Sequence, residues 1–177
     1  MNKSEKIELV RNAIISYPDF PKPGIIFRDI FGVFRNIVAL QALKDLIVDH
    51  ILFMEIDLVV GLDSRGFLFG PMICLTLGKP FIPIRKKGKL PGKTVQYKYT
   101  SEYSEQIFEI QQDYIKEGTR VIIVDDLLAT GGTMAAAINL LHSHAVEVVE
   151  CLTIIELTGL KGREKLDVPV HSFIQYD

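Results

Sequence analysis

Two adjacent carboxylates stand just before a glycine-rich segment in the second half of the chain. Asp125 and Asp126 follow the apolar run 121–124, and a helical pattern begins at the end of Ala129-Thr130-Gly131-Gly132-Thr133. Backbone N–H groups at the start of a helix bind phosphate, and glycines let the backbone approach it closely. Carboxylate oxygens accept hydrogen bonds and suit sugar hydroxyls. The complete pattern predicts a site for a phosphorylated sugar, in preference to carboxylates that merely cap a turn.

A second anion site is expected after the apolar run 58–62. Asp63-Ser64-Arg65-Gly66 stands where this run ends and a helical pattern begins. An arginine and the N–H groups of a helix start can hold an anion by charge-assisted hydrogen bonds. From these residues alone, a serine-capped helix with a solvated Arg65 is an equally good interpretation.

Two further segments carry candidate residues. The run 85–93 is basic, and such runs usually form a solvated surface or an import-like signal. That interpretation is weaker here, because the run directly follows an apolar stretch in a chain of net negative charge. Glu102 lies in a polar stretch of roughly sixteen residues without clear periodicity, and loops of that length are often active-site lids or disordered. By itself, Glu102 is typical of a solvated acid, and 26–28 is typical of a buried strand.

Helical and extended patterns alternate along most of the chain. Apolar spacing predicts helices at about 5–16, 39–53, 67–77, 107–115 and 133–144, and strands at 25–30, 58–62, 81–84, 121–124, 146–157 and 172–176. Strands that are apolar on both faces and alternate with helices predict an α/β fold with a mainly parallel twisted sheet flanked by helices. Ligands bind such sheets at the carboxyl ends of the strands, where both candidate anion sites begin.

Composition narrows the class of protein. The chain has 177 residues, about one domain's worth, and its 48% hydrophobic content excludes a disordered protein. A net charge of −2 disfavours a nucleic-acid binder. The N-terminus shows no signal-peptide pattern, no apolar run approaches the length of a membrane span, and Cys74 and Cys151 lie far apart. We therefore expect a soluble cytoplasmic protein with reduced cysteines that binds neither nucleic acid nor membrane.

The segment 121–133 resembles the 5-phosphoribosyl 1-pyrophosphate (PRPP) signature of type I phosphoribosyltransferases. Blocks elsewhere resemble the members of that family that act on adenine, and they follow in family order from about residue 18 to the C-terminus: 20–30, 61–67, 85–92 and 156–166. The resemblance implies the type I phosphoribosyltransferase fold in a single domain over 1–177. It also implies a small hood of about residues 1–35 over the base site, and a flexible catalytic loop.

The resemblance also implies which residues hold PRPP. Asp125 and Asp126 would hold the ribose 2- and 3-hydroxyls, directly or through Mg²⁺. The 5-phosphate would be wrapped by Ala129, Thr130, Gly131, Gly132 and Thr133. The pyrophosphate would be bound by Asp63, Ser64, Arg65, Gly66, Arg85 and Lys89. The family usually has a cis peptide bond at the position of Asp63-Ser64, and it places the equivalents of Arg85 and Lys89 partly across a dimer interface.

For the base, the resemblance implies contacts from both ends of the chain. Glu102, with Tyr103 beside it in the catalytic loop, would exchange a proton with N7 of the purine. Ser101 and Ser104 stand where the family more often has Leu and Gly, so the glycine hinge is missing. The backbone of Ile26 and Arg28 would read the adenine edge, and Phe27 and Leu157 would lie on its two faces.

The implied reaction transfers the 5-phosphoribosyl group of PRPP to N9 of adenine and gives AMP and pyrophosphate. Mg²⁺ would be held mainly by the substrate, and the protein would be a homodimer. A PRPP-sensing regulator on the same fold is an alternative that needs a helix-turn-helix or a basic face. A different base, such as hypoxanthine or xanthine, is a second alternative, against which the resemblance at 26–28 is the sole argument.

Overall fold

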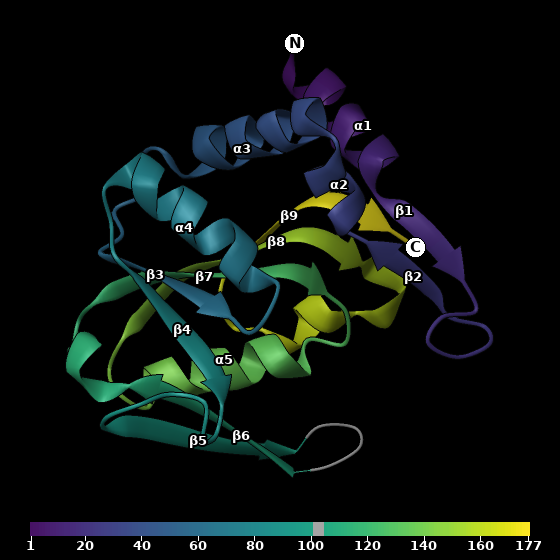
Figure 1. The fold of residues 1–177 in the computed structure, drawn as a ribbon. Helices are drawn as coiled ribbons and strands as arrows, with labels where there is room; N and C mark the ends of the chain where they lie inside the picture. The colour runs from purple at the N-terminus through teal and green to yellow at the C-terminus, as the bar shows by residue number, and fades with distance from the viewer. Residues whose placement is uncertain (101–104) are drawn as a thin grey trace. The chain divides into compact units, whose positions relative to one another are not determined.

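The computed structural model describes residues 1–100 and 105–177 (Figure 1), and this part of the chain divides into two compact units, Met1–Phe53 and Met54–Asp177. The expected hood of about residues 1–35 falls within the first unit, which extends further along the chain. That all 177 residues act as one domain stays a prediction. No helix in the described ranges is long and apolar enough to span a membrane.

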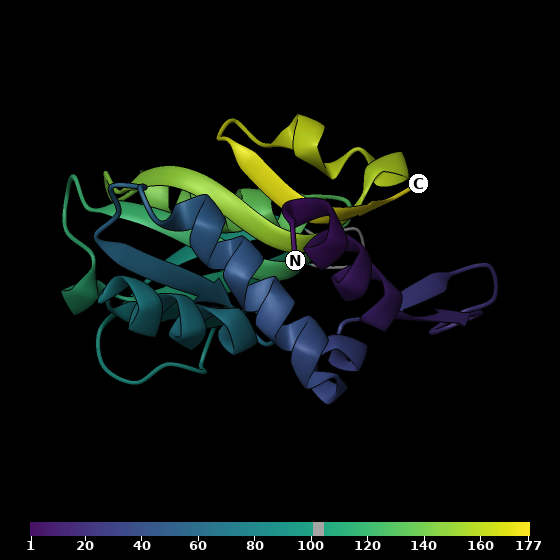
Figure 2. The same ribbon diagram turned by 90° about the horizontal axis from the view of Figure 1, so that it is seen from above.

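The first unit combines helices with a short antiparallel hairpin. Its helices are α1 (Lys3–Ala13), α2 (Phe31–Arg35) and α3 (Ile37–Ile51), and its strands are β1 (Ile15–Pro18) and β2 (Ile26–Asp29). Asn2 caps α1 through a capping box with Glu5, and α1 packs against α3 (Figure 2). The expected helix over 39–53 and the extended segment over 25–30 are confirmed. The expected helix over 5–16 ends early, because the chain from Ile15 pairs with β2 instead.

The second unit is built on a sheet which, among the described residues, has seven strands in the order β5-β6-β4-β3-β7-β8-β9. Their bounds are β3 (Leu58–Leu62), β4 (Phe81–Lys86), β5 (Thr94–Thr100), β6 (Glu105–Gln111), β7 (Arg120–Leu128), β8 (Glu147–Leu157) and β9 (Val170–Tyr176). The pairs β3–β4, β3–β7, β7–β8 and β8–β9 are parallel, whereas β6 is antiparallel to β4 and β5. The mainly parallel sheet is confirmed.

Helices α4 (Gly66–Leu77) and α5 (Gly132–His142) cover opposite faces of this sheet (Figure 1). α4 contacts β3, β4 and β7, and α5 contacts β5, β6 and β8. The central strands β3 and β7 are therefore buried on both faces, and Val59, Val60, Ile122 and Ile123 are inaccessible to solvent. This burial explains why these strands are continuous apolar runs in the sequence.

The strand order reverses between β3 and β7, which lie side by side in parallel with Gly61 paired to Val124. The chain leaves β3 toward β4 on one side and leaves β7 toward β8 on the other. Ligands bind at such a switch point, beyond the carboxyl ends of the strands. Gly66 makes the close packing possible, because a Cβ there would lie 2.5 Å from the carbonyl oxygen of Val124.

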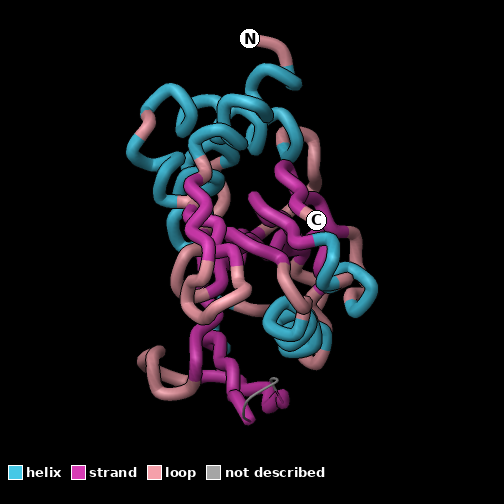
Figure 3. The backbone as a smooth tube through the Cα atoms, turned by 90° about the vertical axis from the view of Figure 1, so that its right-hand side faces the viewer, coloured by secondary structure: helices cyan, strands magenta, loops and turns pink. Residues whose placement is uncertain are grey.

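Two expectations for the region between β4 and β7 are wrong. The residues expected to form a helix over 107–115 instead form β6 and a short 3₁₀ helix, Gln112–Tyr114. The polar stretch that follows the strand at 81–84, in which we expected no clear periodicity, contains β5, which pairs with β6 (Figure 3). Every second residue of β5 packs against the core, namely Val95, Tyr97 and Tyr99, and the residues between them are polar. This two-residue repeat of apolar side chains is that of a strand.

Candidate active site

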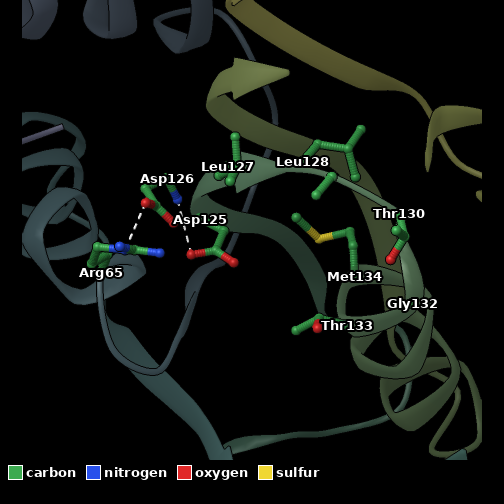
Figure 4. Close-up of a pocket in the computed structure, with 11 residues that line it drawn as sticks. Arg65, Asp125, Asp126, Leu127, Leu128, Thr130, Gly132, Thr133 and Met134 are labelled. Carbon is green, nitrogen blue, oxygen red and sulfur yellow. Dashed lines mark hydrogen bonds and ion pairs between the residues drawn. The ribbon is translucent and has the colours of Figure 1, made fainter. Parts of the chain in front are cut away.

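Arg65 and residues 125–134 line a cavity of about 150 Å³ at the end of β7 (Figure 4). The lining joins the residues of the predicted sugar-phosphate site to one residue of the second predicted anion site. Pockets for whole small molecules are typically about 300–1,000 Å³. The cavity is therefore of a size for a phosphate group with part of a sugar.

The glycine-rich segment forms the start of α5. Gly131 is the N-cap residue with a positive φ of 81°, and its carbonyl accepts the first helical hydrogen bond, from Ala135 at 2.9 Å. The first N–H groups of a helix have no acceptor within it, and the helix dipole makes this end positive. Here those groups belong to Gly132, Thr133 and Met134, which line the cavity. We call residues 129–133 the phosphate cradle.

Gly131 also lies against a segment to which we assigned no role from the sequence. A Cβ on Gly131 would lie 2.4 Å from the carbonyl oxygen of Gly162, and a Cβ on Gly162 would lie 2.2 Å from that of Ala129. The two backbones are in contact with no room for a side chain. The signal that could have found Gly162 is the glycine itself, shortly after the long strand β8.

The two carboxylates belong to β7, which continues through them to Leu128. Asp125 Oδ1 accepts a hydrogen bond from the backbone N–H of Asp126 at 2.9 Å, and Asp126 Oδ2 lies 2.7 Å from Arg65 Nε (Figure 4). Burial and the neighbouring Asp126 carboxylate raise the pKa of Asp125 well above its ordinary value. Burial also raises the pKa of Asp126, against the opposing effect of Arg65. Such a crowded pair favours a ligand that brings hydrogen-bond donors or a cation.

The second predicted anion site lies in the turn between β3 and α4. The Asp63–Ser64 peptide bond is cis, which confirms the expectation, and Arg65 precedes the first residue of α4. The ion pair of Arg65 with Asp126 brings this turn to the same cavity as the phosphate cradle. The alternative interpretation is wrong, because α4 has no side-chain cap and Arg65 is ion-paired with a buried carboxylate.

The basic run is brought to the same turn. Arg85 Nε donates to Asp63 Oδ2 at 2.8 Å, and Arg85 Nη1 donates to the carbonyl of Lys89 at 3.2 Å. Asp63, Arg85 and Lys89 therefore lie together, although twenty or more residues separate Asp63 from the other two.

A buried acid anchors the basic run from β6. Glu109 is 2% exposed, and its Oε1 accepts hydrogen bonds from the backbone N–H groups of Lys89 and Leu90, each at 2.9 Å. Burial opposes its ionisation, but these and neighbouring N–H donors outweigh burial, so the pKa of Glu109 is lowered. We did not identify Glu109 from the sequence. A single charged residue between Phe108 and Ile110 is the signal that could have marked it.

The predicted adenine residues occur in both units. Ile26, Phe27 and Arg28 lie on β2, where Phe27 packs edge-to-face on Phe20 with ring centroids 5.2 Å apart. Ile26 is 51% exposed, so β2 is not the buried strand that its residues alone indicate. Leu157 ends β8 in the second unit. A shared role in base binding stays a prediction.

The predicted catalytic Glu102 and its neighbour Tyr103 lie outside the described residues, as do Ser101 and Ser104. Elsewhere, in 1–100 and 105–177, no group of three or more His, Cys, Asp or Glu side chains is arranged to hold a metal ion.

Comparison with known proteins agrees with this geometry. Residues 35–175 match the family model of the phosphoribosyl transferase domain. The adenine phosphoribosyltransferase of Mus musculus is 50% identical over 176 residues, which cover 97% of this chain and 98% of that protein.

Two solved structures extend the comparison. The Saccharomyces cerevisiae adenine phosphoribosyltransferase, complexed with adenine and an imino-altritol bisphosphate, has a TM-score of 0.90 at 42% identity and covers 96% of this chain and 99% of its own. The Trypanosoma brucei enzyme, in complex with AMP, pyrophosphate and ribose-5-phosphate, has a TM-score of 0.89 at 27% identity and covers 99% and 81%. This chain belongs to the phosphoribosyltransferase family and, within it, to the adenine phosphoribosyltransferases.

Proposed function

We propose that this chain transfers the 5-phosphoribosyl group of PRPP to N9 of adenine and releases AMP and pyrophosphate. The observation that carries the proposal is the cavity in which a phosphate cradle, a carboxylate pair and Arg65 meet. Its parts match the parts of PRPP, which has a phosphate, a ribose with two hydroxyls and an anionic leaving group. Relatives of the same length with this activity in their names support it.

PRPP lies across the switch point in this proposal. The cradle, Ala129 through Thr133, binds the 5-phosphate with helix N–H groups, and Asp125 and Asp126 accept hydrogen bonds from the ribose hydroxyls. The pyrophosphate faces the side of the site that carries the positive charges of Arg65, Arg85 and Lys89. We call this the basic side; Asp63, Ser64 and Gly66 complete it.

The charges assigned to PRPP in this proposal suit the reaction. Displacement at the anomeric carbon builds positive charge on the ribose and negative charge on the departing pyrophosphate. Carboxylates near the ribose and cationic side chains near the leaving group stabilise this separation, and fixed charges need no reorganisation as the reaction proceeds. Arg65 is paired to Asp126, so it joins the two sides of this charge distribution.

The residues present suit Mg²⁺ bound together with the substrate. Mg²⁺ prefers oxygen ligands and is usually held by one or two carboxylates plus substrate phosphates. Asp125 and Asp126 offer such oxygens, and the pair favours a cation because burial raises both pKa values. Bound there, Mg²⁺ would supply neutralisation of the pyrophosphate charge.

The base site selects adenine by its 6-amino group. We assign the reading of its edge to the backbone of Ile26 and Arg28, with Phe27 and Leu157 on its faces. A carbonyl that accepts from a 6-amino group meets a second acceptor when the base carries a 6-oxo group, which leaves buried polar groups unpaired. Glu102 exchanges the proton at N7.

We further propose a homodimer in the cytoplasm. α4 is apolar on most of its surface, yet Leu75 is 87% exposed and Leu68 is 37% exposed, as expected of a helix that a second copy covers. Cys74 and Cys151 are free thiols, which suits a reducing compartment. Sedimentation of the purified protein tests the dimer.

The test of the activity is turnover of PRPP with adenine, hypoxanthine, guanine, xanthine and uracil in parallel. AMP formation from adenine, with poor turnover of the 6-oxo bases, is the expected result. A kcat/KM for hypoxanthine comparable to that for adenine would contradict the base assignment. Tight PRPP binding without turnover of any base would favour the regulator instead.

A further inference from the structure

The phosphate cradle rests on a segment that follows β8. Gly162 is buried and begins the 3₁₀ helix Gly162–Lys165, and its backbone touches the cradle at Ala129 and Gly131. Because neither Gly131 nor Gly162 has space for a Cβ, the contact is between main chains. The position of the cradle therefore depends on whatever holds Gly162 in place.

Arg163, the next residue, fixes Gly162 through its guanidinium group. Its Nε donates to Glu156 Oε1 at 3.0 Å and its Nη2 donates to Glu156 Oε2 at 2.5 Å. Nη1 donates to the carbonyl of Val170, and Nη2 also reaches Ser172 Oγ at 3.2 Å. The planar guanidinium binds a carboxylate with two parallel hydrogen bonds, which sets direction as well as distance.

Glu156 in turn is fixed to the sheet. It is buried near the end of β8, and in the sheet it is paired with Leu128, the residue directly before the cradle. Ser172 and Gln175 on β9 also donate to its Oε2, at 2.5 Å and 3.3 Å. The hydrogen bond from Arg163 lowers the pKa of Glu156, so the pair is ionised at neutral pH.

We propose that Glu156 and Arg163 are positioning residues that hold the phosphate cradle in its binding conformation through Gly162. The chain of contacts runs from β8 to Glu156, to Arg163, to Gly162 and to the backbone of Ala129 and Gly131. The described lining of the cavity contains neither charged side chain, so their effect reaches a ligand through the cradle. The inference rests on the proposed function, because it assigns the 5-phosphate to the cradle.

Calorimetric titration with two separate probes tests this. Ribose 5-phosphate reports on the cradle, and inorganic pyrophosphate reports on the basic side of the site. In Arg163→Met the affinity for ribose 5-phosphate should fall about tenfold or more, the scale of a lost charged hydrogen bond, whereas that for pyrophosphate should stay within about twofold. Arg163→Lys keeps the charge but cannot form the two parallel hydrogen bonds of the guanidinium, so we expect an intermediate loss of affinity for ribose 5-phosphate.

A matched control lies at the opposite end of the same strands. Arg120 pairs with Glu55 at 3.0 Å and with Glu147 at 3.4 Å, where β7 and β8 begin. Arg120→Met removes an arginine and its ion pairs and should leave both affinities unchanged. Arg163→Met could unfold because it leaves Glu156 buried without its partner. The double variant Glu156→Gln/Arg163→Met removes both charges, and it should also bind ribose 5-phosphate weakly and pyrophosphate normally.

Three results would overturn the proposal or its basis. Wild-type affinity for ribose 5-phosphate in the double variant, or an equal loss for both probes, would show that the pair serves stability alone. Wild-type protein that binds neither probe would overturn the proposed function, and this inference with it.

Discussion

Arg65 Nε lies 2.7 Å from Asp126 Oδ2, and this ion pair joins the turn after β3 to the end of β7. The side chain of Asp126 is 7% exposed and that of Arg65 is 34% exposed, so the carboxylate is almost entirely removed from solvent while part of the arginine side chain remains accessible. In the proposed function, this pair sets the distance between the residues for ribose and those for pyrophosphate.

Removing the guanidinium should weaken PRPP binding. Arg65→Met leaves the Asp126 carboxylate buried without its cation and removes a positive charge from the proposed pyrophosphate site. We expect the Kd for PRPP, measured by calorimetry, to rise about tenfold or more. Arg120→Met is the matched control. An unchanged Kd in Arg65→Met would mean that Arg65 has a structural role without a part in binding.

Neighbouring glycines should respond differently to alanine. Gly131→Ala forces a Cβ against the carbonyl of Gly162 at a positive φ. At Gly132 a new Cβ would meet no described atom within 4 Å beyond its chain neighbours and the backbone of α5 itself. Gly131→Ala should lower the free energy of unfolding by about 1–3 kcal/mol and abolish PRPP binding. Gly132→Ala should be as stable as the wild type or more stable, since alanine favours the helix.

Thermal unfolding of the two glycine variants checks this difference. Equal Tm values for Gly131→Ala and Gly132→Ala would contradict the contact between the cradle and Gly162.

Asp125 should cost stability at neutral pH. Its pKa is raised in the folded protein, so between the ordinary and the raised pKa the folded state holds a proton that the unfolded chain releases. The free energy of unfolding therefore falls as the pH rises from the ordinary aspartate pKa through the raised one. Asp125→Asn has no such proton. It should unfold at the wild-type Tm in acid and a few degrees higher at neutral pH, since about 1 kcal/mol shifts Tm by about 2–4 °C at this length. It should also lose activity.

The corresponding change at Asp126 is the control for this prediction. Asp126→Asn loses the partner of Arg65, so we expect a smaller gain in Tm or a loss. A wild-type Tm for Asp125→Asn across the whole pH range would contradict the raised pKa.

Glu109 should affect the pyrophosphate side of the site. Glu109→Gln keeps the size of the side chain but weakens the hydrogen bonds that hold the backbone of Lys89 and Leu90. We expect pyrophosphate affinity to fall by about threefold to tenfold, with ribose 5-phosphate affinity unchanged. This is the reverse of the pattern expected for Arg163→Met. The same calorimetric titrations measure both, and a loss of ribose 5-phosphate affinity alone would contradict it.

Glu102→Gln tests the proton transfer. Glutamine keeps the size and one acceptor but cannot exchange the proton, so kcat should fall by about 10²-fold or more while PRPP affinity changes little. Glu105→Gln, at the start of β6, is the control, since Glu105 pairs with Lys98 at 2.7 Å. Full activity of Glu102→Gln in steady-state assays would assign the proton to another group or to water.

Local sequence was sufficient for the elements that carry the site. The apolar runs at 58–62 and 121–124 specify buried parallel strands, and the glycines after the second run specify the turn into α5, because these conformations depend on residues adjacent in the chain. Asp125 and Asp126 could be singled out for the same reason. The helix expected over 107–115 failed where local evidence was ambiguous, since Phe108 and Ile110 also fit the period of a strand and β6 has partners on both sides.

The tertiary structure decided which of these residues meet. Asp126 meets Arg65 and Asp63 meets Arg85 because β3 lies between β4 and β7 in the sheet, an order that depends on pairing between distant segments. Gly162 meets Gly131 because the chain turns back after β8, and Glu109 reaches the basic run across the antiparallel edge of the sheet. Backbone conformation follows from neighbouring residues, whereas the partner of a buried charge or glycine is chosen by the packing of the whole sheet.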